Sequence, residues 1–154
     1  MALPGAGRVG SAPMPRMSED EAVAFLADGA RTGKLATISR AGRPHVVPVW
    51  FVLDGRDVVF TSWHKALKSR HLRRDPRTAL CVDDERPPFS FVEVRGEVTI
   101  DPAAPDLLDW TTRIATRYMG VAEGAAYGRR NAVEGEWLMR LRPERVAGVA
   151  RVAD

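Results

Sequence analysis

Apolar and polar residues alternate over several short stretches of the chain, a pattern typical of half-buried β-strands. The alternation is clearest over residues 89–100, where valines recur at alternate positions. Turn sequences separate the stretches, and Asp54-Gly55 is a dipeptide that closes tight hairpins. The sequence therefore predicts strands over residues 34–40, 43–53, 56–62, 77–83, 89–100, 136–142 and 145–150.

Helical patterns interrupt these strands. Ser18 followed three residues later by Glu21 is a capping box, and it predicts a helix that ends before Gly33. A basic helix is expected over residues 63–75, and it must end near Pro76 because the residue before a proline avoids helical geometry. Near-helical apolar spacing predicts another helix over residues 104–119. Residues 120–134 are ambiguous and are compatible with one more short helix.

The order of these elements lacks the strict βαβ alternation of a doubly wound sheet. It favours a mainly β, antiparallel fold, in which a closed or nearly closed barrel carries helices on its outside. The sequence contains no internal repeat and no linker, so residues 18–154 are expected to form a single domain. Residues 1–17 begin with a stretch rich in Ala, Gly and Pro, and we expect them to form a flexible N-terminal arm.

A chain of 154 residues with 45% hydrophobic and 28% charged residues is typical of one globular domain. No apolar run approaches the roughly 18 residues of a membrane span, so no membrane partner is expected. The first residues lack the apolar stretch of a secretory signal, and the single cysteine, Cys81, excludes an internal disulfide. These features predict a cytoplasmic protein. The net charge of +3 permits an anionic partner without demanding one.

The most informative segment joins a strand to the basic helix. Thr61 and Ser62 end the strand where the helix is expected to begin, and hydroxyls and free amides at such a junction form a natural anion site. Lys65 and Lys68 are three residues apart, so they would share one helix face. A bound phosphate would then meet two hydroxyls and two ammonium groups. The alternative is a solvated basic face without a ligand.

Two aromatic segments also suggest ligand contact. Pro48 inside a predicted strand removes a hydrogen-bond donor, and a flat ring system lying on that strand beside Trp50 would explain its place. The alternative is an edge strand with an aromatic side chain in the core. Phe89 and Phe91 alternate along another strand and would point the same way, to cover a ligand or a partner subunit. Core packing is the alternative for this pair.

Other familiar chemistry is missing from the sequence. No GxGxxG or Walker motif is present, and His45, His64 and His71 lack metal-ligand spacing with other donors. No Ser/His/Asp arrangement follows from the spacing. Tyr118 and Tyr127 are candidates for a general acid by chemistry alone, so the catalytic residue stays unknown and no metal is expected.

The order of these features resembles the pyridoxamine 5′-phosphate oxidase-like split β-barrel family, and in particular its branch that uses the deazaflavin coenzyme F420. The resemblance covers residues 18–100 well and the C-terminal strands more loosely. Its most specific piece is the run from Lys68 to Pro76. The matching segments are Gly33-Lys34-Leu35-Ala36-Thr37-Ile38, Gly42-Arg43-Pro44, Val47-Pro48-Val49-Trp50-Phe51, Thr61-Ser62, Lys68-Ser69-Arg70-His71-Leu72-Arg73-Arg74-Asp75-Pro76 and Val94-Arg95-Gly96-Glu97-Val98.

The resemblance implies roles for individual residues. Lys68 would bind the cofactor phosphate with help from Ser62 and Lys65, and His71 stands where the family usually carries an asparagine that contacts the cofactor. Along the tricyclic ring would lie Pro48, Val49 and Trp50. The family places its sites between subunits, so the chain is expected to form a homodimer in which Phe89 and Phe91 reach the partner's cofactor.

The resemblance also implies a reaction. Reduced F420 donates a hydride, and the protein positions ring and substrate without needing a dedicated catalytic side chain. Substrates in the family are small molecules, including quinone-like, unsaturated and tetrapyrrole compounds such as biliverdin. FMN is the rival cofactor, but six cations (Lys65, Lys68, Arg70, Arg73, Arg74 and Arg77) against Asp75 favour the more anionic F420.

Two non-enzymatic readings complete the set of alternatives. The same barrel could carry a flavin, haem or tetrapyrrole without turnover. A nucleic-acid partner is not expected, because the basic helix has few interleaved aromatic residues and the total charge is small.

Overall fold

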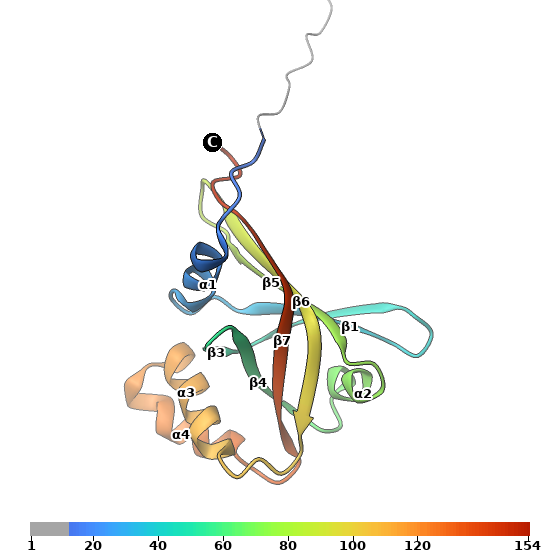
Figure 1. The fold of residues 1–154 in the computed structure, drawn as a ribbon. Coiled ribbons are helices and arrows are strands. Elements are labelled where there is room, and N and C mark those ends of the chain that lie inside the picture. The colour runs from blue at the N-terminus through green and yellow to red at the C-terminus, as the bar shows by residue number, and fades with distance from the viewer. Residues whose placement is uncertain (1–12) are drawn as a thin grey trace, which may run out of the picture.

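The computed structural model describes residues 13–154, and within them seven strands form one antiparallel sheet flanked by four helices (Figure 1). The predicted mainly β, antiparallel fold is therefore confirmed. The sheet order is β2-β1-β5-β6-β7-β4-β3. The strands are β1 (Gly33–Ile38), β2 (Pro44–Val49), β3 (Val52–Asp54), β4 (Asp57–Trp63), β5 (Arg77–Asp84), β6 (Ser90–Asp101) and β7 (Glu136–Val149), and the helices are α1 (Glu19–Ala27), α2 (Leu67–Arg74), α3 (Leu107–Met119) and α4 (Val121–Asn131).

The two edges of the sheet are joined by a very short connector. Strands β2 and β3 are consecutive in sequence but lie at opposite edges, and only Trp50 and Phe51 separate them. The three steps from Val49 to Val52 span at most about 11 Å, so the sheet must curl until its two edges come close together. The result is a nearly closed barrel. The strand predicted over residues 43–53 is thus wrong as a single element, because the chain changes sheet edge in its middle.

The interior of the barrel holds the main core. Its largest fully buried side chains include Phe51, Phe60, Leu80 and Met139. A second cluster lies where α3 covers β3 and β4, and it is centred on Trp110 and Ile114. Helix α4 packs against α3 through Gly128, where an added Cβ would overlap the side chain of Thr112. The short helix considered for residues 120–134 is confirmed.

The C-terminal strand differs from its prediction. Two strands were expected, separated at Pro143-Glu144, but β7 continues through this point and pairs with β6 on both sides of it. The register places Arg95 opposite Arg145 and Gly96 opposite Pro143, which leaves Glu144 as the extra residue of a bulge. A bulge tolerates proline because its extra residue interrupts the ladder where proline lacks an N–H group.

The capping box at Ser18 and Glu21 is confirmed and begins α1. Of the arm expected over residues 1–17, residues 1–12 lie outside the described part of the chain. Arg16 forms an antiparallel bridge with Val149, and the amide of Met17 donates to the carbonyl of Gly148 at 3.0 Å. The last residues before α1 are therefore tied to β7. No helix in residues 13–154 has the length and apolar character needed to cross a membrane.

Candidate functional site

The corner between β4 and α2 carries the predicted anion site, and its backbone is fixed by internal hydrogen bonds. The Ser69 hydroxyl donates at 2.7 Å to the hydroxyl of Ser62 and lies at the same distance from the carbonyl of Trp63. The amide of His64 donates to the carbonyl of Gly135 at 2.8 Å. These bonds hold residues 64–66 in a turn, so α2 begins at Leu67 and not at residue 63 as predicted.

This later start changes the place of the two lysines. Lys65 lies in the turn and is exposed, whereas Lys68 lies in the first turn of α2 and is half-buried. The prediction that both lysines share one helix face is therefore wrong. The Ser62 hydroxyl is buried and engaged by Ser69, so it is not free of internal partners.

Lys68 faces one carboxyl group, that of Glu136 at the start of β7. The register sets Glu136 opposite Trp63, the last residue of β4. Burial lowers the pKa of Lys68, and the Glu136 carboxylate opposes this change. Burial raises the pKa of Glu136, against the effects of Thr61 and Lys68. A half-buried ammonium group and a carboxyl group that resists ionisation thus share this corner.

The surrounding cations are fewer than the sequence suggested. Arg77 lies on β5 and forms a bidentate pair with Asp75, a hydrogen bond that lowers the pKa of Asp75 to about 2. Arg74 donates to the carbonyl of Ile38. Within residues 13–154, five cations of this region form no ion pair, namely Lys65, Lys68, Arg70, Arg73 and Arg74. The corner therefore keeps a surplus of positive charge.

Aromatic rings border this corner. The Trp63 and His64 rings lie 4.4 Å apart, and the His64 and Trp137 rings lie 6.0 Å apart. Trp63 is 42% exposed, although it is one of the largest apolar side chains in the protein. An exposed tryptophan beside a cationic corner can pack against a flat conjugated ring.

His71, predicted to contact the cofactor, points into the protein. It is 7% exposed, its Nδ1 lies 2.9 Å from the Thr37 hydroxyl, and its ring meets the edge of His45. Burial lowers the pKa of His71, and the neighbouring His45 adds to this effect. His71 thus anchors α2 to β1 and β2, and its contact with a cofactor stays a prediction.

The second predicted group of residues lies where β2 ends. Pro48 is exposed on this edge strand, opposite Lys34 of β1, which agrees with the rule that proline avoids central strands. Val49 is buried, and Trp50 stacks on Tyr118 with ring centroids 5.1 Å apart. Tyr118 also donates from its hydroxyl to the carbonyl of Arg31 at 2.9 Å. Tyr118, a candidate acid by its chemistry, therefore has a structural partner.

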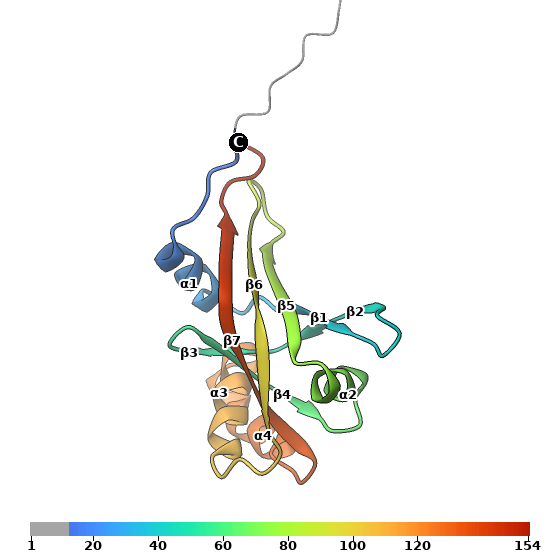
Figure 2. The ribbon, with the colours of Figure 1, turned by 45° about the vertical axis from the view of Figure 1, so that its right-hand side comes forward.

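Phe89 and Phe91 lie far from α2 within one chain. Both line a small cavity with Val152, and the loop that precedes β6 lies near the C-terminus, away from α2 in both views (Figures 1 and 2). Phe89 has a left-handed φ of 58° and precedes β6, so the two rings do not alternate along one strand as predicted. They could meet the β4–α2 corner only in another copy of the chain.

Sequence reasoning missed Glu136 and Ser69. Glu136 was seen only as the start of a strand, and its place beside Lys68 depends on the pairing of β4 with β7. Ser69 lies seven residues after Ser62, a spacing without a recognised pattern. The described residues contain no group of three His, Cys, Asp or Glu side chains placed to hold a metal ion.

A barrel whose edges are joined by two residues, with a cationic strand-to-helix corner, defines the split β-barrel class. The sequence profile of pyridoxamine 5′-phosphate oxidase matches residues 18–150, and the chain belongs to that family.

Solved structures are similar over most of the chain. A conserved hypothetical protein, Rv2991 from Mycobacterium tuberculosis, is 25% identical with a TM-score of 0.74, over 88% of this chain and 87% of that one. An F420 reductase is 29% identical with a TM-score of 0.64, over 79% of this chain and 93% of that one. An FAD-binding protein from Mesorhizobium loti shares the fold at 20% identity and a TM-score of 0.67, over 88% and 95% of the two chains.

Proposed function

We propose that this protein binds the deazaflavin coenzyme F420 at the β4–α2 corner and acts as an oxidoreductase on a small conjugated molecule, such as a quinone-like or tetrapyrrole compound. The observation that carries the proposal is the half-buried Lys68, which forms no ion pair in the described chain and has unpaired cations around it. The similarity to an F420 reductase supports the same cofactor.

The cations and the exposed tryptophan of the corner suit an anionic, flat cofactor, whereas the predicted hydroxyl contacts are less well placed. Lys68, Lys65 and Arg70 offer charge to a phosphodiester and to carboxylates, and the exposed Trp63 offers a surface for a ring. The hydroxyl of Ser62 is engaged by Ser69, so the cations supply most of the anion binding. When bound, F420 supplies the hydride chemistry. The chain's own residues bind its anionic groups, orient it and exclude water.

The proposal includes a homodimer. Phe89 and Phe91 lie away from α2 in their own chain and line a cavity at the surface. In a two-fold dimer they would cover the cofactor held by the partner, which would account for a large exposed aromatic side chain at this end of β6.

FMN is the second candidate, because the family match is to pyridoxamine 5′-phosphate oxidase. Fluorescence titration of cofactor-free protein with F420 and with FMN separates the two. Saturable F420 binding at least tenfold tighter than FMN binding supports the proposal, and reduced F420 can then be used to screen substrates. A preference for FMN moves the protein to the flavin branch. If the protein binds a cofactor but reduces none of the conjugated substrates tested, it is a carrier and not an enzyme.

Replacing Lys68 with alanine is expected to weaken F420 binding by about 1.5–3 kcal/mol, the usual contribution of a hydrogen bond to a charged group. The same titration measures this change. Arg129→Ala removes an exposed cation from α4 and serves as the charge-matched control, for which the dissociation constant should stay the same. An equal loss of F420 affinity in both variants would show that Lys68 contributes only to the overall positive charge of the protein and makes no specific contact.

Replacing Glu136 with glutamine is expected to tighten F420 binding by about 1 kcal/mol, because it removes a negative charge that faces the same lysine as the cofactor. Burial raises the pKa of Glu136, so this carboxyl group takes up a proton at a higher pH than an ordinary glutamate does. Wild-type binding should therefore strengthen as the pH is lowered from neutral, more steeply than binding to Glu136→Gln. If the pH profiles of F420 binding are parallel for the wild type and Glu136→Gln, the charge of Glu136 does not weaken F420 binding.

A further inference from the structure

Trp63, the last residue of β4, is the most exposed of the four tryptophans, and its backbone is fixed by three neighbours. In the β4–β7 register it lies opposite Glu136. Its carbonyl accepts a hydrogen bond from the Ser69 hydroxyl at 2.7 Å and another from the Ala66 amide at 2.9 Å. A surface ring on a fixed backbone loses less conformational freedom when a ligand packs on it than a mobile one does.

The ring of His64 lies beside the ring of Trp63 and is itself held in place. The His64 amide donates to the carbonyl oxygen of Gly135 at 2.8 Å, and Nδ1 of His64 lies 3.0 Å from the same oxygen. A carbonyl oxygen only accepts, so Nδ1 carries a proton and the orientation of the imidazole is fixed. The centroid of the His64 ring is 4.4 Å from that of Trp63 and 6.0 Å from that of Trp137.

Gly135 brings the loop before β7 into contact with both rings. Its φ is 92°, a conformation that favours glycine. A Cβ atom at this position would lie 2.6 Å from Nδ1 of His64 and 2.7 Å from Cζ3 of Trp63. The loop therefore leaves room for these two rings only because it carries no side chain here. The place of the Trp63 ring follows from β4, from His64 and from this loop together, and 42% of Trp63 remains exposed.

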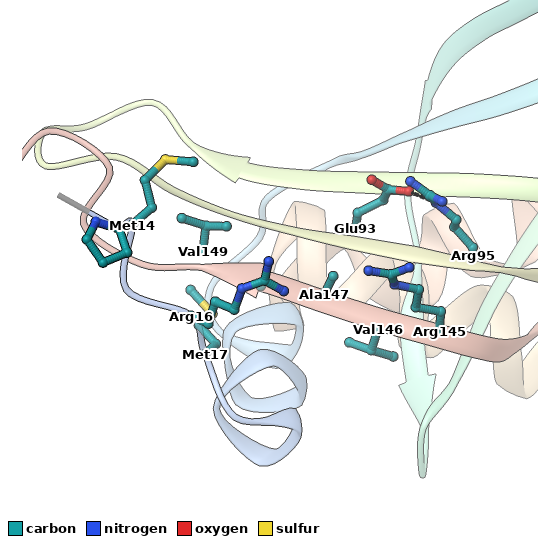
Figure 3. Close-up of a pocket in the computed structure, with 11 residues that line it drawn as sticks. Met14, Arg16, Met17, Glu93, Arg95, Arg145, Val146, Ala147 and Val149 are labelled. Atoms are coloured by element: carbon teal, nitrogen blue, oxygen red, sulfur yellow. Dashed lines mark hydrogen bonds and ion pairs between the residues drawn. The ribbon is translucent and has the colours of Figure 1, made fainter. Parts of the chain in front are cut away.

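Two other surfaces offer only part of what a flat anionic cofactor needs. Trp50 has its ring stacked on Tyr118, with centroids 5.1 Å apart and planes 3° from parallel, so one of its faces is covered within the chain. A groove between residues 13–17, β6 and β7 contains three arginines, Arg16, Arg95 and Arg145 (Figure 3). None of the described residues that line this groove is aromatic. The β4–α2 corner combines an exposed aromatic ring with cations that form no ion pair in the described chain.

We propose that Trp63 is the residue on which the flat ring of the cofactor stacks, and that His64 is a positioning residue that holds Trp63 through its bonds to Gly135. The inference rests on the proposed function, because it takes the ligand to be a deazaflavin or a flavin. It assigns the ring to Trp63 and not to the segment from Pro48 to Trp50. The ring and the phosphate of the cofactor are then bound by different residues, Trp63 and Lys68, and each contact can be removed separately.

Ligands with and without phosphate test the assignment of the ring. The phosphate-free ribityl deazaflavin is F420 without its phosphodiester and oligoglutamate tail. In fluorescence titrations, Trp63→Leu should weaken the binding of both ligands by the same factor, roughly tenfold, the contribution of one stacked ring. Trp63→Phe keeps a flat ring and should stay within about threefold of the wild type. Lys68→Ala should weaken the binding of F420 and leave that of the phosphate-free ligand unchanged.

Variants of His64 test its positioning role. His64→Ala should weaken the binding of both ligands about fivefold, because Trp63 loses its support. His64→Asn should recover most of this loss, since the amide nitrogen of asparagine can donate to Gly135 in place of Nδ1. Arg145→Gln removes a cation from the groove of Figure 3 and should change neither affinity. Circular dichroism confirms that each variant is folded at the temperature of the titration.

The emission of the bound ligand gives a second measurement. A stacked tryptophan quenches the fluorescence of a flavin-type ring by electron transfer. The saturated complex of Trp63→Leu should therefore be brighter than the wild-type complex. A purely structural role of Trp63 would change the affinity without changing the emission of each bound ligand.

Three results would overturn the inference. The first is unchanged affinity for both deazaflavins in Trp63→Leu. The second is a loss in Trp50→Leu without a loss in Trp63→Leu, which would place the ring at the connector between β2 and β3. The third is equal binding by His64→Asn and His64→Ala, which would show that the bond to Gly135 does not position the ring.

The failure of F420 as the cofactor is a separate outcome. Riboflavin and FMN form a second pair of ligands that differ only in the phosphate, and they take the place of the deazaflavins in the same titrations. Dependence of their binding on Trp63 would keep the ring assignment and change only the cofactor. Binding of neither pair would overturn both proposals.

Discussion

Replacing Arg117 with methionine is expected to lower the free energy of unfolding by about 3–5 kcal/mol, because one guanidinium group serves three backbone carbonyls. Near the end of α3, Arg117 donates at 2.7 Å to Leu26, at 2.9 Å to Gly29 and at 2.9 Å to Phe51. Its guanidinium also lies 4.6 Å from the centroid of the Phe51 ring. The side chain therefore ties α3 to α1 and to the connector that closes the barrel.

The loss would exceed that of an ordinary surface arginine because the carbonyls lose their donor while they stay packed. Leu26 lies in the last turn of α1, where carbonyls have no partner within the helix and where α1 itself has no basic residue. Burial lowers the pKa of Arg117, yet a guanidinium group stays protonated in a protein. The charge is thus kept and must be solvated by these carbonyls.

Urea denaturation followed by circular dichroism measures this effect. Arg113→Met is the control one turn earlier on α3, where the side chain is exposed and makes one long hydrogen bond of 3.4 Å to Leu53. Its cost should stay below about 1 kcal/mol. Arg117→Lys should fall in between, since an ammonium group cannot spread over three separate carbonyls. Equal costs for Arg117→Met and Arg113→Met would show that the three bonds do not act together.

The sequence was sufficient for the elements whose signals are local. Ser18 and Glu21 satisfy each other within four residues, so the start of α1 could be predicted without tertiary information. The break between β2 and β3 at Trp50 and Phe51 could not be predicted in this way. The apolar pattern continues through these residues, and the strand ends there only because the chain moves to the other edge of the sheet. The late start of α2 likewise depends on Gly135, which is distant in sequence from His64.

The same distinction applies to the candidate site. Lys68 could be chosen from a motif because its neighbours in sequence are also its neighbours in space. Glu136 could not, since its position follows from the register between β4 and β7. The groove that holds Arg16, Arg95 and Arg145 draws on three separate segments, and no local pattern joins them. Long-range pairing, which a single sequence does not display, decides these contacts.

Replacing Gly96 with alanine is expected to destabilise the protein by about 3 kcal/mol or more, the upper range for overpacking a close contact. Gly96 is buried in β6, and a Cβ atom there would overlap the carbonyl oxygen of Arg142 and crowd Leu141. The clash is with backbone of the neighbouring strand, so a change of rotamer cannot relieve it. The two central strands of the barrel would have to separate at this point.

The position of Gly96 explains why a side chain here would meet the neighbouring strand. It pairs with Pro143, next to the bulge at Glu144, and the extra residue brings the carbonyl of Arg142 close to β6. Glu97→Ala, one residue later and exposed, is the control and should change stability by less than about 0.5 kcal/mol. Urea denaturation compares the two variants. A cost below 1 kcal/mol for Gly96→Ala would mean that β7 can move away from β6 at the bulge, and that the long central strand pair is less rigid than its continuous register implies.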